Sequence, residues 1–364
     1  MPLLPRRCEP VAVLLVAVCC GAQTGPRAVV GAIRWDAWHG DRSEVGKAVE
    51  RSLAPAKWHG RLPFFARVNG EQQVQIDGAN QQVVDREIQY ARTARLDYWA
   101  FLMYAPGSAM NYGLEFYLSS THKRGLRFCL IVEQTQWQNR ESAAQWAERA
   151  AALIARSEYQ LVDGGRPLLY VLAAEPNSEA WGARHTGEAL DLLRAAARSG
   201  GRGEPYVVIL DYRPARASEM RAEARADAIS AYAYQRGGSN APYAQLAREA
   251  EQFWQECAAT GSSVVPIVMS GWDRRPRVEH PVFWETWQKP NVDLGKFYAP
   301  PTPAELSSHL RAAVTWVGAH AAAAPAKAVL IYAWNENDEG GWLVPTLMDG
   351  SWRVQAVRRA LQSQ

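Results

Sequence analysis

Cysteine pairs, clustered histidines and glycine-rich loops are largely missing from this 364-residue sequence. Three of its five cysteines, Cys8, Cys19 and Cys20, lie near the N-terminus. The other two, Cys129 and Cys257, fall in an apolar strand pattern and a helical pattern, so we expect two buried, unpaired thiols rather than a disulfide. The seven histidines are dispersed, with no HxxxH or HxH pair. The sequence therefore predicts no metal centre and no cofactor.

An excess of one charge is also missing. The 40 lysines and arginines nearly balance the 37 acidic residues, leaving a formal charge of +3. The basic residues are scattered, without the stripe that binds nucleic acid or the cluster that binds a membrane surface. Neither partner is expected.

Only one long hydrophobic run is present, and it lies at the N-terminus. Arg6 and Arg7 precede the apolar residues 11–20, and small residues follow up to Ala22. This pattern is typical of a signal peptide, here residues 1–22, and the run is too short to span a bilayer. We expect a secreted or periplasmic protein with no integral membrane segment after cleavage. A lipoprotein anchored through Cys19 or Cys20 is the alternative.

Short apolar runs alternate with amphipathic segments along the rest of the chain. Eight strands followed by eight helices predict an α/β fold, a single (β/α)8 TIM-type barrel over residues 23–364. A doubly wound sheet is the alternative, but the glycine-rich loop typical of it does not follow the first strand. A long insertion before residue 81 is expected to contain a small hairpin near 73–78. The expected strands are 29–35, 96–104, 126–133, 167–172, 206–210, 228–232, 264–269 and 328–334, and the helices 81–95, 109–124, 142–157, 187–199, 215–225, 243–260, 303–320 and 351–362.

Acidic and aromatic residues recur where the predicted strands end. Glu336 and Glu339 follow the eighth strand, between Trp334 and Trp342. Barrel enzymes place their chemistry at these ends, and two carboxyl groups beside flat rings are what glycosidic-bond cleavage requires. The alternative is a solvated turn whose acids cap a helix.

Six further residues on the same rim are expected to hold a sugar, because rings stack on sugar faces and polar groups bind hydroxyls. Asp273 has a second interpretation, an ion pair with the arginines that follow it. Asp211 is more consistent with a helix cap or loop anchor. The six are Glu133, Asp273, Asn335, Trp35, Trp38 and Trp272.

Four segments resemble the glycoside hydrolase family 99-like proteins, which include endo-α-1,2-mannosidases and mannanases and have relatives described as lipopolysaccharide-biosynthesis proteins. Trp334-Asn-Glu-Asn-Asp-Glu-Gly340 is similar to the family's WNEWxEG motif. The other three are Phe128-Cys-Leu-Ile-Val-Glu133, Gly164-Gly-Arg-Pro-Leu-Leu-Tyr170 and Gly271-Trp-Asp-Arg-Arg-Pro-Arg277.

The resemblance implies a retaining hydrolase acting on a glycan or polysaccharide. Glu336 would be the base that assists attack by the substrate's 2-hydroxyl, and Glu339 would be the general acid. The chain departs from the pattern at Asn337, Asp338 and Val344, and Val-Leu-Ala-Ala follows Tyr170. These departures motivate a second hypothesis, a non-catalytic carbohydrate-binding barrel of the cell envelope. A third, a glycosyltransferase-associated role in surface-polysaccharide assembly, conflicts with export because nucleotide sugars are cytoplasmic.

Overall fold

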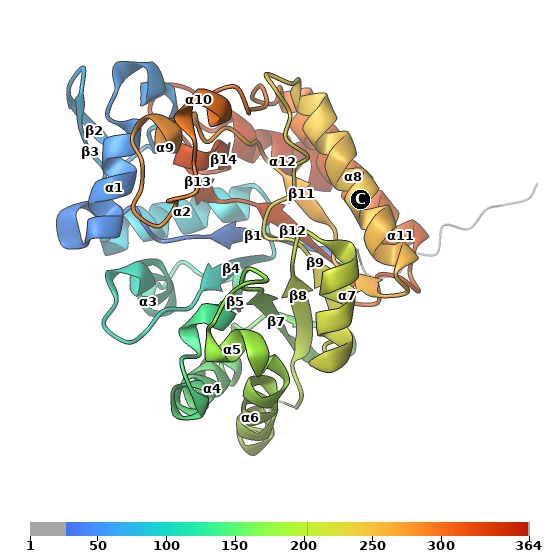
Figure 1. Ribbon diagram of the computed structural model, residues 1–364. Coiled ribbons are helices and arrows are strands. Elements are labelled where there is room, and N and C mark those ends of the chain that lie inside the picture. Colours follow the sequence, from blue (N-terminus) through green and yellow to red (C-terminus); the bar gives the residue numbers. More distant parts are fainter. Residues whose placement is uncertain (1–26, 202, 363–364) are drawn as a thin grey trace, which may run out of the picture.

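The computed structural model describes residues 27–201 and 203–362, which form a ring of parallel strands surrounded by helices (Figure 1). The predicted signal peptide, residues 1–22, lies outside the described residues. The main sheet has the order β10-β9-β8-β7-β5-β4-β1-β12-β11. Its strands are β1 (Val29–Arg34), β4 (Tyr98–Leu102), β5 (Arg127–Glu133), β7 (Arg166–Leu172), β8 (Tyr206–Leu210), β9 (Ala228–Ser230), β10 (Ser263–Val264), β11 (Ile267–Met269) and β12 (Ala328–Tyr332).

The barrel closes through β10 and β11, which are two pieces of one strand. Pro266 lacks a backbone N–H and interrupts the ladder between them. The Val265 N–H still donates to Ile229 O of β9 at 3.1 Å, and the Leu330 N–H of β12 donates to Pro266 O at 3.0 Å. The strand therefore pairs with β9 on one side and β12 on the other. Counted this way, eight parallel strands form a (β/α)8 barrel, as the sequence predicts.

One helix packs outside the barrel after each of the eight strands. Thr302 shows how local sequence sets a boundary: its hydroxyl accepts from the Glu305 N–H at 3.3 Å, and its own N–H donates to the Glu305 carboxylate at 2.8 Å. This capping box begins a helix with proline at its first position. The helices are α2 (Gln81–Thr93), α3 (Tyr112–Ser119), α4 (Arg140–Ile154), α6 (Thr186–Ser199), α7 (Pro214–Glu223), α8 (Tyr243–Ala259), α11 (Pro303–Ala319) and α12 (Trp352–Gln362).

The insertion after β1 contains the expected hairpin, β2 (Arg67–Gly70) and β3 (Gln73–Gln75), and a helix that the sequence did not predict, α1 (Glu44–Leu53). The β11–α11 connection holds two more short helices, α9 (Arg275–Glu279) and α10 (Pro290–Asp293), and α9 packs beside α1. These added segments lie together on one side of the barrel (Figure 1). Two further short elements are α5 (Trp181–Arg184) and β6 (Leu161–Val162), which pairs antiparallel with β7.

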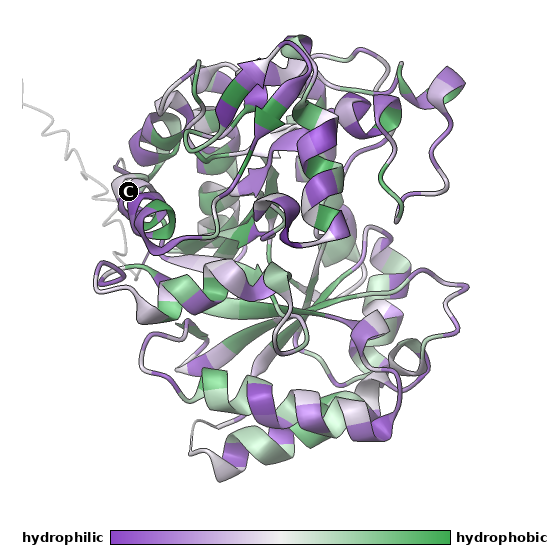
Figure 2. Cartoon of the chain, turned by 90° about the vertical axis from the view of Figure 1, so that its left-hand side faces the viewer, coloured by the Kyte–Doolittle hydropathy of each residue, from purple (hydrophilic) through white to green (hydrophobic). Residues whose placement is uncertain are grey.

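Apolar residues fill the interior of the barrel and the layer between strands and helices, and the outer helix faces are hydrophilic (Figure 2). Cys129 on β5 and Cys257 on α8 are buried and unpaired, as expected. Among the described residues, none of the helices is long and apolar enough to cross a membrane.

Candidate active site

A cavity of about 410 Å³ opens at the carboxyl ends of the strands. Parallel barrels expose side chains there on loops that the strands hold in place. Its walls come from the ends of β4, β5 and β7, from residues that follow β1, β4 and β9, from α1, and from the loops that follow β11 and β12. The lining residues are Trp35, Val45, Leu102, Tyr104, Met110, Glu133, Leu172, Tyr232, Arg277, Phe283, Trp284, Glu285, Glu336 and Glu339.

A small hairpin after β12 carries both glutamates into this cavity. Its strands are β13 (Asn335–Glu336) and β14 (Gly341–Trp342), joined by a 3₁₀ turn over Asn337–Glu339. Gly340 ends the turn with φ 87°, and a Cβ there would collide with the backbone nitrogen of Asp273. That nitrogen donates to Glu339 O at 2.7 Å. The glycine therefore allows the loop after β11 to clamp the hairpin.

Glu336 is 3% exposed and has one short polar contact. The Tyr232 hydroxyl donates to Glu336 Oε1 at 2.7 Å, while Arg277 Nη2 lies 3.4 Å from Oε2. Burial, and next the charge of Glu339, raise the pKa of Glu336 well above its usual value. The surroundings of Glu336 therefore favour its neutral, protonated form.

Glu339 is in the opposite situation. Arg277 Nη1 and the Tyr332 hydroxyl both donate to its carboxylate, and Arg274 Nη2 lies 3.3 Å away. Burial alone would raise the pKa of Glu339, but the charges of Arg274 and Arg277 and the tyrosine hydrogen bond lower it. The two pKa values are thus shifted in opposite directions, which favours a proton on Glu336 and a charge on Glu339. This resting distribution is the reverse of the roles implied by the family resemblance.

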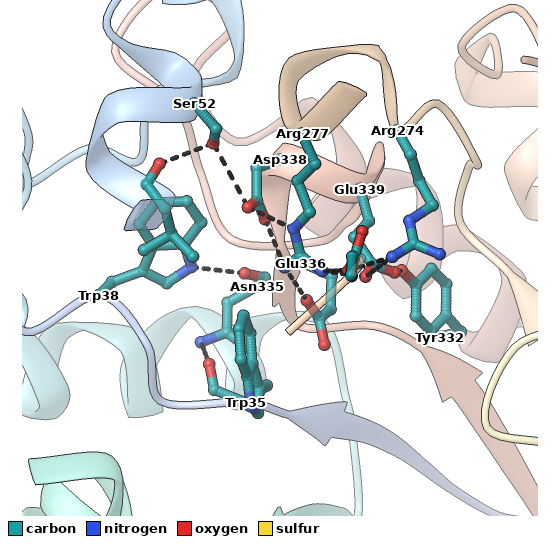
Figure 3. A network of polar contacts seen from close by, with 12 residues as sticks. Trp35, Trp38, Ser52, Arg274, Arg277, Tyr332, Asn335, Glu336, Asp338 and Glu339 are labelled. Carbon is teal, nitrogen blue, oxygen red and sulfur yellow. Dashed lines mark hydrogen bonds and ion pairs between the residues drawn. The ribbon is translucent and has the colours of Figure 1, made fainter. Parts of the chain in front are cut away.

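Arg277 is the centre of this network (Figure 3). Its Nε lies 2.7 Å from Asp338 Oδ2, and its Nη1 lies 2.8 Å from Glu285 Oε1. Only 2% of the residue is exposed, and a buried guanidinium is stable only when its donors are satisfied. Both glutamates of the hairpin contact the same guanidinium, so their carboxyl groups are close neighbours.

Aromatic side chains lie directly beside the charges, since the Arg277 guanidinium is 5.0 Å from the Trp35 ring centroid and 5.6 Å from that of Trp284. The Asn335 side chain fixes Trp35 by accepting from its N–H at 3.0 Å and donating to its carbonyl at 2.7 Å. Trp35 Nε1 donates to the Tyr104 hydroxyl at 2.8 Å. The Trp35 ring lies 5.8 Å from that of Trp284, centroid to centroid. The cavity therefore combines flat apolar rings with acids, the combination a sugar ring needs.

No protein-family model matches this chain, and no curated protein matches it in sequence. Solved structures do resemble it. A GH99 endo-alpha-mannosidase from Bacteroides thetaiotaomicron, in complex with Bis-Tris-propane, superposes with a TM-score of 0.58 over 92% of this chain and 96% of the other, at 12% identity. A glycoside hydrolase-like protein gives a TM-score of 0.59 over 97% and 96%, also at 12% identity. The chain has a glycoside hydrolase-like fold. The resemblance drawn from the sequence motifs is confirmed at that level.

Of the eight site residues predicted from the sequence of this glycoside hydrolase-like barrel, Trp35, Glu133, Glu336 and Glu339 line the cavity. The remaining four lie behind or beside it. Asn335 and Trp38 support it: Trp38 is buried and its Nε1 donates to Asn335 O at 2.6 Å. Trp272 packs with its ring 5.6 Å from that of Tyr332.

Asp273 forms ion pairs with arginines, which was the second interpretation of this residue. Its carboxylate pairs with Arg61 and lies 2.7 Å from Arg275 Nη2. Burial would raise the pKa of Asp273, but these arginine contacts lower it. The ion pairs hold the start of the loop that reaches Glu339. Asp211 likewise anchors its own loop, accepting from the Arg213 N–H at 2.8 Å and pairing with Arg216.

The residues missed from the sequence are Arg277, Arg274, Glu285, Tyr104, Trp284 and Phe283. One signal for the arginines was present, because a run of basic residues after the seventh strand faces a run of acids after the eighth. Within the part of the chain that the structure describes, no group of three or more histidine, cysteine or acidic side chains is arranged to hold a metal ion.

Proposed function

We propose that this chain is a secreted glycoside hydrolase that cleaves a glycosidic bond in a glycan or polysaccharide, without a cofactor. The observation that carries the proposal is the pair Glu336 and Glu339, two carboxyl groups that line one aromatic cavity, contact one guanidinium, and have their pKa values shifted in opposite directions. Two carboxyl groups whose environments drive their pKa values apart are the usual basis of acid–base catalysis on glycosides. The shared fold agrees with this reaction class.

The resting charges assign the roles. Glu336 gives its proton to the leaving oxygen as the C–O bond breaks. Glu339 acts at the anomeric side, either as nucleophile or by drawing the proton from a neighbouring hydroxyl of the sugar, and Glu336 then takes a proton from the incoming water. Since both carboxyl groups contact one guanidinium, the arrangement favours the short spacing, about 5 Å, of retaining enzymes. The product should keep the anomeric configuration of the substrate.

The first experiment measures release of reducing ends from α-mannans, α-glucans and bacterial surface polysaccharides. Glu336→Gln and Glu339→Gln should both lose at least about a hundredfold in kcat. Glu249→Gln is the matched control, because Glu249 is also buried but hydrogen-bonds to Tyr298, away from the cavity. Equal activity of the two site variants and the control would overturn the proposal.

Glycosyl fluorides decide between the two role assignments, because fluoride leaves without a proton donor. If Glu336 is the acid, Glu336→Gln should still release fluoride in the first turnover, whereas Glu339→Gln should not. The opposite result would restore the roles implied by the family resemblance.

One observation favours a second candidate, a carbohydrate-binding barrel without catalysis. Glu339 is held by two arginines and a tyrosine, and such a carboxylate is a weak base and a weak nucleophile. Saturable binding of one of these polysaccharides with no new reducing ends would support this candidate.

Export of the protein is proposed from residues 1–22 alone. An N-terminus at Gln23 in protein recovered from the periplasm or medium would support export.

A further inference from the structure

Two large apolar rings are left exposed on the loop between α9 and α10. Phe283 and Trp287 are each 60% exposed, although both could contribute much apolar area to a core. Exposed apolar groups that gather beside a cavity indicate a binding surface. In Figure 1 this loop runs past α1 and the catalytic hairpin.

The rings continue the wall of the cavity outward. Trp35 lies inside, 5.8 Å from Trp284, and Trp284 lies 4.9 Å from Phe283 with the two rings perpendicular. Phe283 and Trp284 both line the cavity, and Phe283 is also open to solvent. A ligand that fills the cavity and extends outward therefore meets an uninterrupted row of aromatic side chains.

The same loop is tied to the catalytic charges. Glu285 pairs with Arg277 at 2.8 Å and also with Arg274. The Arg274 guanidinium lies over the Trp287 ring, 4.9 Å from its centroid. Arg274 is itself 3.3 Å from Glu339. Arg274 thus connects the exposed Trp287 ring to Glu339, and Phe283 contacts the loop's buried part through Trp284.

We propose that Phe283, Trp284 and Trp287, the aromatic platform, bind further sugar residues of the chain whose scissile bond lies in the cavity. The substrate is then an oligosaccharide or polysaccharide that extends beyond the cavity, rather than a small glycoside. This proposal rests on the proposed function. The occupant follows from continuity with the cavity, because sugar C–H faces stack on exposed rings while their hydroxyl groups remain in water.

Affinity electrophoresis in native gels tests binding apart from turnover. Gels containing yeast α-mannan, an α-glucan or a bacterial capsular polysaccharide are run with the Glu336→Gln protein, with and without Phe283→Ala/Trp287→Ala. Tyr212→Ala is the matched control, because Tyr212 is 50% exposed with Arg213 over its ring, and it does not line the cavity. We expect the platform variant to bind up to about tenfold more weakly for each ring removed, and the control to bind normally.

Kinetics on otherwise wild-type protein separate this proposal from the proposed function. The platform variant should lose kcat/KM on the polysaccharide and keep it on a fluorogenic monosaccharide glycoside. Cleavage of the polymer that the platform variant retains in full would overturn the platform and leave the hydrolase standing. Platform-dependent binding without cleavage by any variant would support the platform and overturn the hydrolase. Three results would overturn the platform. They are equal gel retardation of all variants, no retardation by any of the three polysaccharides, and a change only in oligomeric state.

Discussion

Arg277 balances the charge of the cavity, since one guanidinium serves Asp338, Glu285 and both glutamates of the hairpin. Arg277→Met should lower the free energy of unfolding by about 3 kcal/mol, because buried carboxylates lose their partner. The pKa of Glu339 should rise, so the acid limb of the kcat/KM profile should move to higher pH. Urea titration and a pH–rate profile measure the two effects.

Arg216→Met is the control for that change. Arg216 also pairs with an aspartate, Asp211, but the pair lies outside the cavity lining. It should lower stability by a smaller amount and leave the pH profile in place. An unmoved acid limb in Arg277→Met would show that this arginine does not set the charge of Glu339.

Glu336 gives stability a pH dependence of definite sign. Its pKa is raised in the folded protein, so the native state keeps a proton that the unfolded chain releases above about pH 4.5. Stability should therefore fall as pH rises from 4.5 towards the folded pKa, by up to about 1.4 kcal/mol per pH unit. Glu336→Gln removes this loss. Urea unfolding at pH 5 and pH 8 should show the variant gaining on wild type at the higher pH.

An exposed carboxylate provides the comparison, since Glu188 pairs with Arg140 at the surface. Glu188→Gln should keep a constant stability difference from wild type at both pH values. The same constant difference in Glu336→Gln would mean that Glu336 is not protonated in the folded protein.

Single residues also show how much of the cavity could be predicted from the sequence. Glu336, Glu339, Glu133 and Trp35 all line the cavity, because strand ends share one edge of a barrel. Trp38 and Asp273 follow the same rule in sequence, yet they turn to Asn335 O and to Arg61. The direction of a loop side chain depends on contacts with residues hundreds of positions away in the sequence. The periodicity of the local sequence does not predict these contacts.

At the scale of elements, the hairpin after β12 depends on two loops that meet at Gly340. Gly340→Ala must place a Cβ against the backbone of Asp273 and also hold a left-handed φ of 87°. Gly237→Ala must hold only the left-handed φ, here 78°, because the space around Gly237 is open and its Cβ would contact no other atom. Gly237→Ala should cost about 1 kcal/mol and spare kcat. Gly340→Ala should cost more and lower kcat by about a hundredfold, because it displaces Glu339.

Thermal unfolding and steady-state kinetics on the two alanine variants measure this difference. Similar losses of stability in both, with kcat unchanged, would show that the contact between the two loops is not needed to position Glu339.

Elements with regular periodicity were predicted well, and irregular ones were not. The eight strands and eight helices fall within a few residues of the expected ranges, and the box at Thr302 sets the start of α11. The seventh strand is the exception, since Pro266 divides it into β10 and β11. The helix α1 lies in the insertion after β1 and was missed, although Ser43 caps it by accepting from the Gly46 N–H at 3.3 Å and its buried residues repeat at helical spacing.

At the scale of the whole molecule, the ring of strands makes cooperativity the expected behaviour. Each strand pairs with two neighbours, and the β10–β11 strand completes the circuit between β9 and β12. No strand can leave without breaking two ladders and opening the core on both sides. The hairpin of β13 and β14 and the proposed aromatic platform rest on the same ring, so the cavity should be lost with the barrel rather than before it.

The two buried thiols report on this directly. Cys129 lies on β5 and Cys257 on α8, and burial raises the pKa of each. Neither should react with a thiol reagent such as DTNB in the folded protein, because the thiolate is the reactive form. Cys129→Ala leaves Cys257 as the thiol of the pair that can be labelled, and Cys257→Ala leaves Cys129. In denaturant below the unfolding midpoint, the DTNB labelling rates of the two variants should differ only by the amount that their difference in unfolding free energy predicts. One barrel domain that opens as a unit requires this result. Rates that differ by more than about tenfold after that correction would instead show that the β5 and α8 sides of the barrel unfold separately.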